Sequence, residues 1–165
     1  MILYKGKKFI LVKQKCQLPT GYVTSKEIII HPGAALVIPL LNKNRVILIY
    51  QYRAALKTYL YELPTGTLDH GEQPINCARR ELVEETGYAA EKFTKLGHIY
   101  PVPGYCNEVI TIYKAEQLYK KRGNKDPDEI IRVCLFDRNR VQRLFRSGKM
   151  EDAKTISAFA FCGWL

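Results

Sequence analysis

Residues 66–88 read GTLDHGEQPINCARRELVEETGY, and this stretch decides the fold. The chain carries a formal net charge of +10, yet it gathers four glutamates here. These acids are Glu72, Glu81, Glu84 and Glu85. Like charges this close repel one another, so the folded protein must either absorb that cost or neutralise it.

The segment 74–86 is predicted to be an α-helix. Pro74 suits the first helical turn, and Gly87 suits the left-handed residue just after the last turn. An apolar stripe at helical spacing is formed by Ile75, Ala78 and Leu82. The last three glutamates stand at i, i+3 and i+4, within an arc of roughly 100° beside this stripe. We therefore expect the acids at the border of the buried face.

The acidic arc has two explanations, a solvated helix face or a bound divalent cation. Arg80 softens the repulsion, but one cation cannot balance three neighbouring acids. Mg²⁺ takes oxygen ligands, keeps several waters and often bridges one or two carboxylates to substrate phosphates. In that case the basic remainder of the chain would meet the rest of an anionic substrate.

Composition bounds the class of protein. At 165 residues and 47% hydrophobic content, the chain fits one domain with a sizeable core. Lys and Arg outnumber Asp and Glu by 26 to 16, but they are spread along the chain, so charge alone does not select a partner. The five cysteines lack CxxC spacing, which favours a reducing cytoplasm over disulfides or a zinc site. No signal peptide or membrane span is expected.

The pattern of apolar runs predicts many strands and few helices. Strands are predicted over 8–18, 21–30, 33–41, 45–53, 59–66, 96–104, 108–118 and 130–136, and helices over 74–86, 139–148 and 151–164. Because no regular βαβ alternation is present, the expected class is a mixed α/β sandwich.

The spacing within 66–88 resembles the signature of the Nudix hydrolases. Five residues separate the first glycine from the first glutamate, and seven separate that glutamate from the arginine. The fixed positions are, in order, Gly66, Glu72, Arg80, Glu81, Leu82, Glu84, Glu85 and Gly87. Tyr88 stands where the family usually has an aliphatic residue. The resemblance implies an α/β/α sandwich around a mixed β-sheet for residues 31–165, with residues 1–30 as an N-terminal β extension.

The resemblance also implies a metal site. Glu81 and Glu85 would be direct Mg²⁺ or Mn²⁺ ligands, and Glu84 would contribute directly or through water. The backbone carbonyl just before the first glycine, here that of Thr65, would be a further ligand.

The implied reaction is hydrolysis of a nucleoside diphosphate linked to another group, by attack of water on a phosphorus. Glu84, Glu72 and Arg80 would belong to the catalytic machinery, the last two as a pair that fixes the loop onto the helix. A carboxylate in a loop before a late strand would accept the proton of the water. Glu129 aligns best with that position, with Asp126 and Asp128 as alternatives.

The flanking sequence resembles the ADP-ribose pyrophosphatase branch of the family. This resemblance covers most of residues 25–162 and is carried by 28–40, 46–72, 100–115 and 147–159. It includes the triplet QYR and the ELPxG lead into the motif.

Four residues outside the motif are candidate substrate contacts: Gln51, Arg53, Pro103 and Glu108. Arg53 could donate to a phosphate or ribose, or it could pair with Glu62 at the end of its strand. Pro103 is either an ordinary loop residue or part of a substrate loop. Glu108 could orient the substrate or pair with a lysine.

The expected function is Mg²⁺-dependent cleavage of ADP-ribose, or of a related nucleoside diphosphate sugar, to a nucleoside monophosphate and a sugar phosphate. The alternatives are hydrolysis of RNA 5′ ends or of dinucleoside polyphosphates, and a non-catalytic module that senses ADP-ribose. The branch usually forms dimers through crossing N-terminal strands, so residues 1–30 predict a homodimer. No membrane or nucleic-acid partner is expected.

Overall fold

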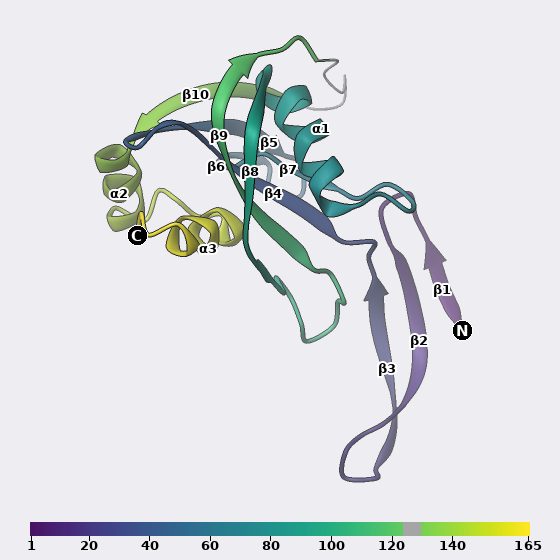
Figure 1. Ribbon diagram of the computed structural model, residues 1–165. Helices are drawn as coiled ribbons and strands as arrows, with labels where there is room; N and C mark the ends of the chain where they lie inside the picture. The colour runs from purple at the N-terminus through teal and green to yellow at the C-terminus, as the bar shows by residue number, and fades with distance from the viewer. Residues whose placement is uncertain (124–129) are drawn as a thin grey trace.

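The computed structural model describes residues 1–123 and 130–165 (Figure 1). The predicted base, Glu129, and its alternatives Asp126 and Asp128 lie outside the described residues. The strands are β1 (Ile2–Lys5), β2 (Ile10–Gln17), β3 (Val23–Ile30), β4 (Ala34–Asn42), β5 (Arg45–Arg53), β6 (Thr58–Glu62), β7 (Thr65–Thr67), β8 (Tyr88–Ile99), β9 (Ile110–Lys120) and β10 (Ile131–Asp137). The helices are α1 (Pro74–Thr86), α2 (Arg138–Arg146) and α3 (Ala153–Phe161).

The central sheet is mixed, as expected. Its strand order is β10-β5-β4-β9-β8, with β6 paired to β5 and β7 paired to β4. Strands β4 and β9 run parallel, whereas the other pairs of this sheet are antiparallel. Strand β4 lies at the centre and pairs with β5, β7 and β9, so the short β7, which opens the motif, is fixed to the middle of the sheet.

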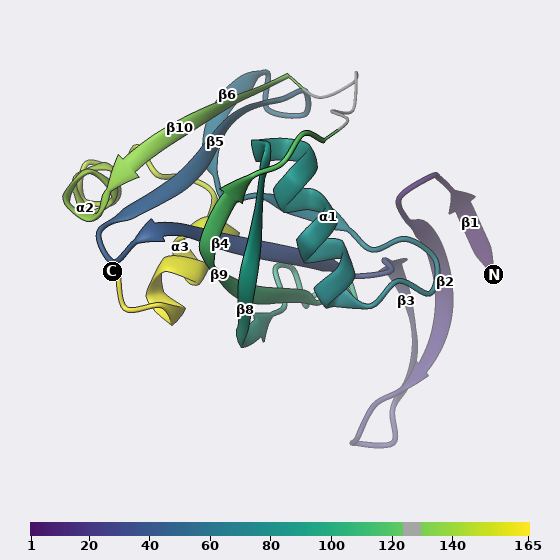
Figure 2. The same cartoon turned by 45° about the horizontal axis from the view of Figure 1, so that its top comes forward.

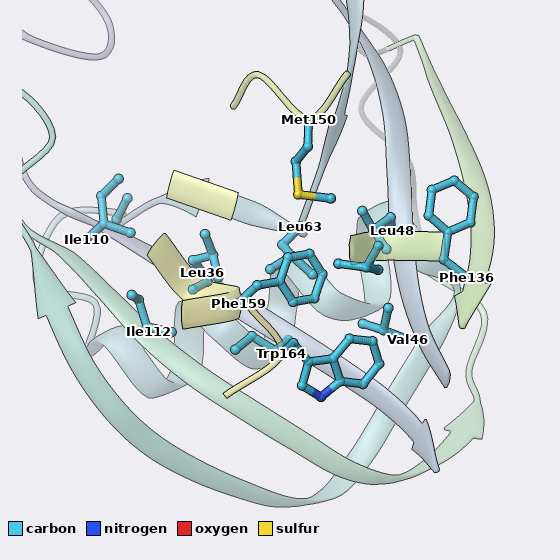
Figure 3. Packing of buried hydrophobic residues seen from close by; sticks show 14 residues of the cluster. Leu36, Val46, Leu48, Leu63, Ile110, Ile112, Phe136, Met150, Phe159 and Trp164 are labelled. Carbon is cyan, nitrogen blue, oxygen red and sulfur yellow. The ribbon is translucent and has the colours of Figure 1, made fainter. Parts of the chain in front are cut away.

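Helices cover both faces of this sheet. In β4, Leu36 and Ile38 belong to the core under α2 and α3, together with Phe159 (Figure 3). The alternate residues of β4, Ala35 and Val37, pack with Ala78 and Leu82 of α1. A strand that is buried on both faces reads as a continuous apolar run, which is why 33–41 was predictable. The expected α/β/α sandwich is confirmed (Figure 2).

The first three strands form a separate antiparallel sheet that projects from one end of the molecule (Figures 1 and 2). Its contact with the body includes the backbone, where the Ile29 N–H donates to the Tyr105 carbonyl at 2.8 Å. Several of its large apolar side chains are exposed, including Ile2 at 62% and Tyr22 at 67%. The division of the chain at residue 30 stays a prediction.

The strand predictions need three corrections. The predicted strand 59–66 is divided into β6 and β7, with Leu63 and Pro64 between them. Strand β8 begins at Tyr88, directly after the helix, and not at residue 96. Residues 91–95 carry four exposed polar side chains around Phe93, so this part of the strand lacks the apolar run that signals a strand. Strand β1 was not predicted because all four of its residues are exposed.

No helix among the described residues is long and apolar enough to cross a membrane.

Candidate active site

Helix α1 has the predicted ends and the predicted buried stripe. Pro74 occupies its first turn, and Gly87 follows the last turn at φ 74°, with its N–H donating to the Val83 carbonyl. Ala78 and Leu82 are fully buried. The helix therefore presents its glutamates along the edge of the packed face.

Two of these glutamates are more buried than the border position predicted from the sequence. Glu81 is 9% exposed and Glu85 is 3% exposed. The Thr65 N–H donates to Glu85 Oε2 at 3.0 Å, which fixes that carboxylate against β7. A Cβ at Gly66 would lie 1.7 Å from Glu81 Oε1, so only glycine allows this carboxylate to approach the strand. Buried carboxylates are costly unless cations or hydrogen bonds compensate them.

Arg80 supplies part of that compensation. Its Nη1 contacts Glu81 Oε1 at 2.5 Å and Glu84 Oε2 at 3.0 Å, and its Nη2 contacts Glu72 Oε2 at 3.0 Å. The hydrogen bond with Glu72, followed by the charge of Glu81, raises the pKa of Arg80, and the same bond lowers the pKa of Glu72. The predicted pair of Glu72 and Arg80 is thus present, and its catalytic role stays a prediction.

The loop before α1 is attached to the helix by a second, unpredicted contact. Cys77 is fully buried, and its thiol donates to the Gly66 carbonyl at 3.3 Å. Burial raises the pKa of this thiol to about 12, so it stays protonated and keeps its donor at neutral pH. Nothing in the spacing of the cysteines pointed to this role.

The donor set suits a hard divalent cation. The side chains of Glu81, Glu84 and Glu85 and the backbone carbonyl of Thr65 offer oxygen ligands only, which is the preference of Mg²⁺ and Mn²⁺. Within 1–123 and 130–165 no three acidic, histidine or cysteine side chains are grouped closely enough to hold a metal ion. Glu81 and Glu84 both bond Arg80.

A cavity of about 810 Å³ opens beside these residues. One side of it, which we call the α1 wall, consists of Arg80, Glu81 and Glu84. A second side, the α3 wall, consists of Arg53, Asp152 and Lys154. The cavity is also lined by β7 and its loop and by Lys8 of the N-terminal extension. Helices from opposite faces of the sheet therefore meet at one site.

The predicted substrate contacts separate into two groups. Arg53 and Glu108 line the cavity. Glu108 lies 3.5 Å from His31 Nδ1, so its partner among the described residues is a histidine and not a lysine. Gln51 is 4% exposed and does not line the cavity, and neither does Pro103, which lies on an exposed turn.

The α3 wall was missed by the sequence reasoning, except for Arg53. Arg53 binds Glu62 with two hydrogen bonds, of 2.6 and 2.5 Å, so the predicted strand-end pair exists and also faces the cavity. Lys154 Nζ bonds the same carboxylate and also Asp152 Oδ1 at 2.7 Å. The only signal in the sequence was the DAKT segment at 152–155, inside a stretch that resembles the branch.

Comparisons with known proteins agree with this geometry. A family model described as NUDIX domain matches residues 30–159. The ADP-ribose pyrophosphatase of Bacillus subtilis (strain 168) is 34% identical over 161 residues, covering 96% of this chain and 87% of that protein. The methanol dehydrogenase activator of Bacillus methanolicus is 33% identical with the same coverage. A crystal structure titled ADP compounds hydrolase has a TM-score of 0.82 and 23% identity, covering 98% of this chain and 91% of that chain.

The chain therefore belongs to the Nudix hydrolase family and resembles its ADP-ribose pyrophosphatase branch along nearly its whole length. The matching structure supports the Nudix fold, and the chain is an enzyme of the hydrolase class.

Proposed function

We propose that this enzyme cleaves the diphosphate of ADP-ribose, or of a related nucleoside diphosphate sugar, to a nucleoside monophosphate and a sugar phosphate. The observation that carries the proposal is a single cavity with carboxylates on one wall and cations on another. A diphosphate needs both, because its negative charge is neutralised in part by metal ions bound to the carboxylates and in part by fixed cations of the protein. The similarity to an ADP-ribose pyrophosphatase over 96% of the chain supports this substrate class.

Glu81, Glu85 and the Thr65 carbonyl would hold Mg²⁺ or Mn²⁺, with Glu84 as a direct or water-mediated ligand. When bound, such an ion screens the diphosphate, polarises its P–O bonds and lowers the pKa of bound water. The chain itself keeps the ligands in place. The Thr65 N–H orients Glu85, Gly66 leaves room for Glu81, and Arg80 holds the carboxylates that face the cavity.

The proton acceptor is proposed to be Glu129, which lies outside the described residues. Glu129→Gln should lower kcat by orders of magnitude while Mg²⁺ binding, measured by calorimetry, is retained. Full activity of this variant would move the role to Asp126, Asp128 or another acid.

Arg53 and Glu108 are proposed to contact the substrate, because both line the cavity. Arg53 offers a planar set of donors that suits phosphate or ribose oxygens. Gln51 and Pro103 do not line the cavity, so the structure adds no support for a substrate contact at either residue.

A homodimer is proposed from the N-terminal sheet. Its exposed apolar side chains, such as Tyr22 and Val23, are candidates for burial against a second copy. Sedimentation at micromolar concentration should give a dimer, and a stable monomer would contradict this proposal. The five free cysteines agree with the predicted cytoplasmic location, which stays a prediction.

The proposed function is tested by a substrate screen. Purified protein is incubated with ADP-ribose, UDP-glucose, GDP-mannose, diadenosine polyphosphates and capped RNA, with Mg²⁺, Mn²⁺ or EDTA, and products are identified by chromatography. We expect AMP and ribose 5-phosphate from ADP-ribose only when a metal is present. Preference for capped RNA or dinucleoside polyphosphates would overturn the proposal, and tight binding of ADP-ribose without turnover would favour a sensor.

A further inference from the structure

Helix α2 and the turn after it form a groove that is lined mainly by cations, which we call the α2 groove. Its volume is about 750 Å³. Four of the six described residues that line it are basic and exposed, and the other two are Leu144 and Ser147. The four basic residues, which we call the basic row, are Arg140, Arg143, Arg146 and Lys149. None of the six lines the active-site cavity. Helix α2 lies at the opposite end of the molecule from the N-terminal sheet (Figures 1 and 2).

The members of the basic row follow one another at intervals of three residues. On a helix this spacing places neighbouring side chains on the same side, and like charges placed in this way repel one another. The segment 138–149 holds five basic residues and no acidic one, so twelve residues carry half of the net charge of +10. Asp137, the acid just before this segment, caps the helix by accepting from the Arg140 backbone N–H at 2.7 Å.

Elsewhere on the surface, cations pair with carboxylates. Lys13 lies 3.4 Å from Glu27, and Lys114 lies 3.1 Å from Glu116. The salt bridges within 1–123 and 130–165 include no member of the basic row. An anion from outside the chain would therefore meet four cations that form no salt bridge with the described residues.

The helix dipole accounts for only part of this charge. Arg143 and Arg146 lie in the last turn of α2, where positive charge is favourable. Arg140 lies in the first turn, where positive charge is unfavourable, and Lys149 follows the helix. The dipole thus explains two members of the basic row and gives no reason for Arg140 or Lys149.

The two ends of the basic row are held in place. The Arg140 guanidinium lies over the Phe136 ring, 3.9 Å from its centroid, a stacked position that leaves the N–H groups at its edge available to an anion. Gly148, at φ 70°, turns the chain back toward the helix, and the Lys149 N–H donates to a carbonyl of the last turn at 2.9 Å. Met150 is 3% exposed, so this turn is anchored in the core. The ends of the row are therefore positioned before a ligand binds.

The length and chemistry of the α2 groove favour a chain of phosphates. Arg140 and Arg146 are six residues apart, which separates their backbones by about 9 Å along the helix axis, and Lys149 extends the row further. A single phosphate cannot contact the whole row, whereas a linear anion can. The N–H groups of arginine suit phosphate oxygens in pairs. No aromatic side chain belongs to the described lining of the groove, so it offers no stacking surface for the bases of single-stranded RNA.

We propose that the α2 groove is a second anion-binding site, which binds a linear chain of three or more phosphates, as in inorganic triphosphate or a nucleoside triphosphate. The site is separate from the cavity beside the motif helix, and the inference does not depend on the reaction catalysed there. Binding would neutralise the charge of the basic row.

The first test is calorimetric titration with inorganic triphosphate at constant ionic strength, in EDTA, so that no divalent ion is bound at the motif helix. The double variant Arg143→Gln, Arg146→Gln is compared with Lys92→Gln, Lys95→Gln, which removes two exposed charges from β8. We expect the wild type and the β8 control to bind equally, and the α2 double variant to bind about tenfold more weakly. Equal binding by the α2 double variant, or no binding by the wild type, overturns the proposal.

The second test compares ligands at the same ionic strength. Orthophosphate should bind about tenfold more weakly than triphosphate, because it contacts only part of the basic row. The relative affinities of triphosphate and ATP then decide between an inorganic and a nucleotide ligand. Equal affinity for orthophosphate overturns the proposal, and so does tighter binding of a short RNA or of a polyglutamate peptide at these residues.

Hydrogen exchange locates the site without any substitution. Triphosphate should slow the exchange of amides in 140–149 and leave those of α1 and α3 unchanged. Slower exchange in α1 or α3 without a change in 140–149 would place the anion in the active-site cavity and would overturn the proposal. This measurement decides the question if the α2 double variant folds poorly.

Discussion

The α1 wall and the α3 wall present opposite charge patterns to one cavity. The α1 wall places Glu81 and Glu84 around Arg80, so that acids outnumber the cation. The α3 wall places Arg53 and Lys154 at the cavity and balances them with Glu62 and Asp152. Under the proposed function this asymmetry has a use, because the acids would attract divalent cations and the cations of the α3 wall would face the anionic diphosphate.

The two walls also differ in how the chain builds them. The side chains of the α1 wall come from one helix, and the strand that supports it, β7, lies just before that helix. The α3 wall joins Lys154 to a carboxylate 92 residues away in the sequence. The α1 wall is therefore defined by the spacing of residues along one helix. The α3 wall forms only when α3 packs against the sheet.

The largest expected effect is at Glu85, which lies on the same helix as the α1 wall but does not line the cavity. Glu85→Gln keeps the shape of the side chain and an oxygen that can accept from the Thr65 N–H, but it removes the charge. We expect kcat to fall by about 10³-fold, or roughly 4 kcal/mol, with the thermal transition nearly unchanged. Glu91→Gln, on an exposed part of β8, is the matched control. Activity that persists in Glu85→Gln would remove the metal site from this helix.

The variant Gly66→Ala tests whether the position of the Glu81 carboxylate matters for activity independently of the stability of the fold. The new Cβ would lie within 1.9 Å of Glu81 Cδ and Oε1, so the carboxylate must move away from β7. We expect activity with saturating Mg²⁺ to fall about 10- to 100-fold, while the free energy of unfolding changes by less than about 1 kcal/mol because a flexible side chain absorbs the clash. Gly104→Ala, where nothing lies within 4 Å of the new Cβ, controls for the unfolding measurement. A large loss of stability with normal activity would show that Glu81 is structural.

Thr155→Val tests the attachment of the α3 wall. Thr155 is fully buried, and its hydroxyl oxygen accepts from the Leu63 N–H. Valine has nearly the same shape but leaves that N–H unpaired, so urea unfolding should show a loss of about 1–3 kcal/mol. Thr94→Val, on the exposed part of β8, should be close to neutral. A neutral result for Thr155→Val would mean that α3 is held by apolar packing alone.

The smallest expected effect concerns Glu72 and pH. The hydrogen bond from Arg80 lowers the pKa of Glu72 in the folded state, so its contribution to stability is complete above the unfolded value of about 4.3 and disappears as the pH falls through the lower folded value. Glu72→Gln should therefore be less stable than the wild type by less than about 1 kcal/mol at pH 7, and the difference should vanish in acid. Denaturant unfolding from pH 7 to pH 3 measures this, and a difference that is independent of pH would contradict it.

Much of the α1 wall could be predicted from the sequence. Pro74, Gly87 and the stripe through Ala78 and Leu82 gave the helix and its ends, because capping and burial at helical spacing are local properties. The depth of Glu81 could not be predicted, since it depends on the approach of Gly66 from another strand. The start of β8 was also missed, because residues 91–95 are mostly polar and the pairing of β8 with β9 is tertiary.

The four residues predicted to contact the substrate lie in different surroundings. Arg53 and Glu108 reach the cavity, whereas Gln51 faces the interior and Pro103 lies on a turn. Gln51 and Arg53 are two positions apart on β5, so they share a face of the sheet. Arg53 is the last residue of the strand and reaches the cavity, whereas Gln51 lies within the sheet and is buried, and the triplet QYR alone does not show this difference.

The sequence by itself determined the motif helix, the mixed class of the sheet and the family of the enzyme. It could do so because spacing along one helix fixes which side chains share a face, and because a strand buried on both faces is apolar throughout. Only the tertiary structure decided that Arg53, Asp152 and Lys154 form a second wall of the site, with the buried Glu62 behind it. Charges so far apart in the chain meet through the packing of α3 against the sheet, and no local pattern records that contact.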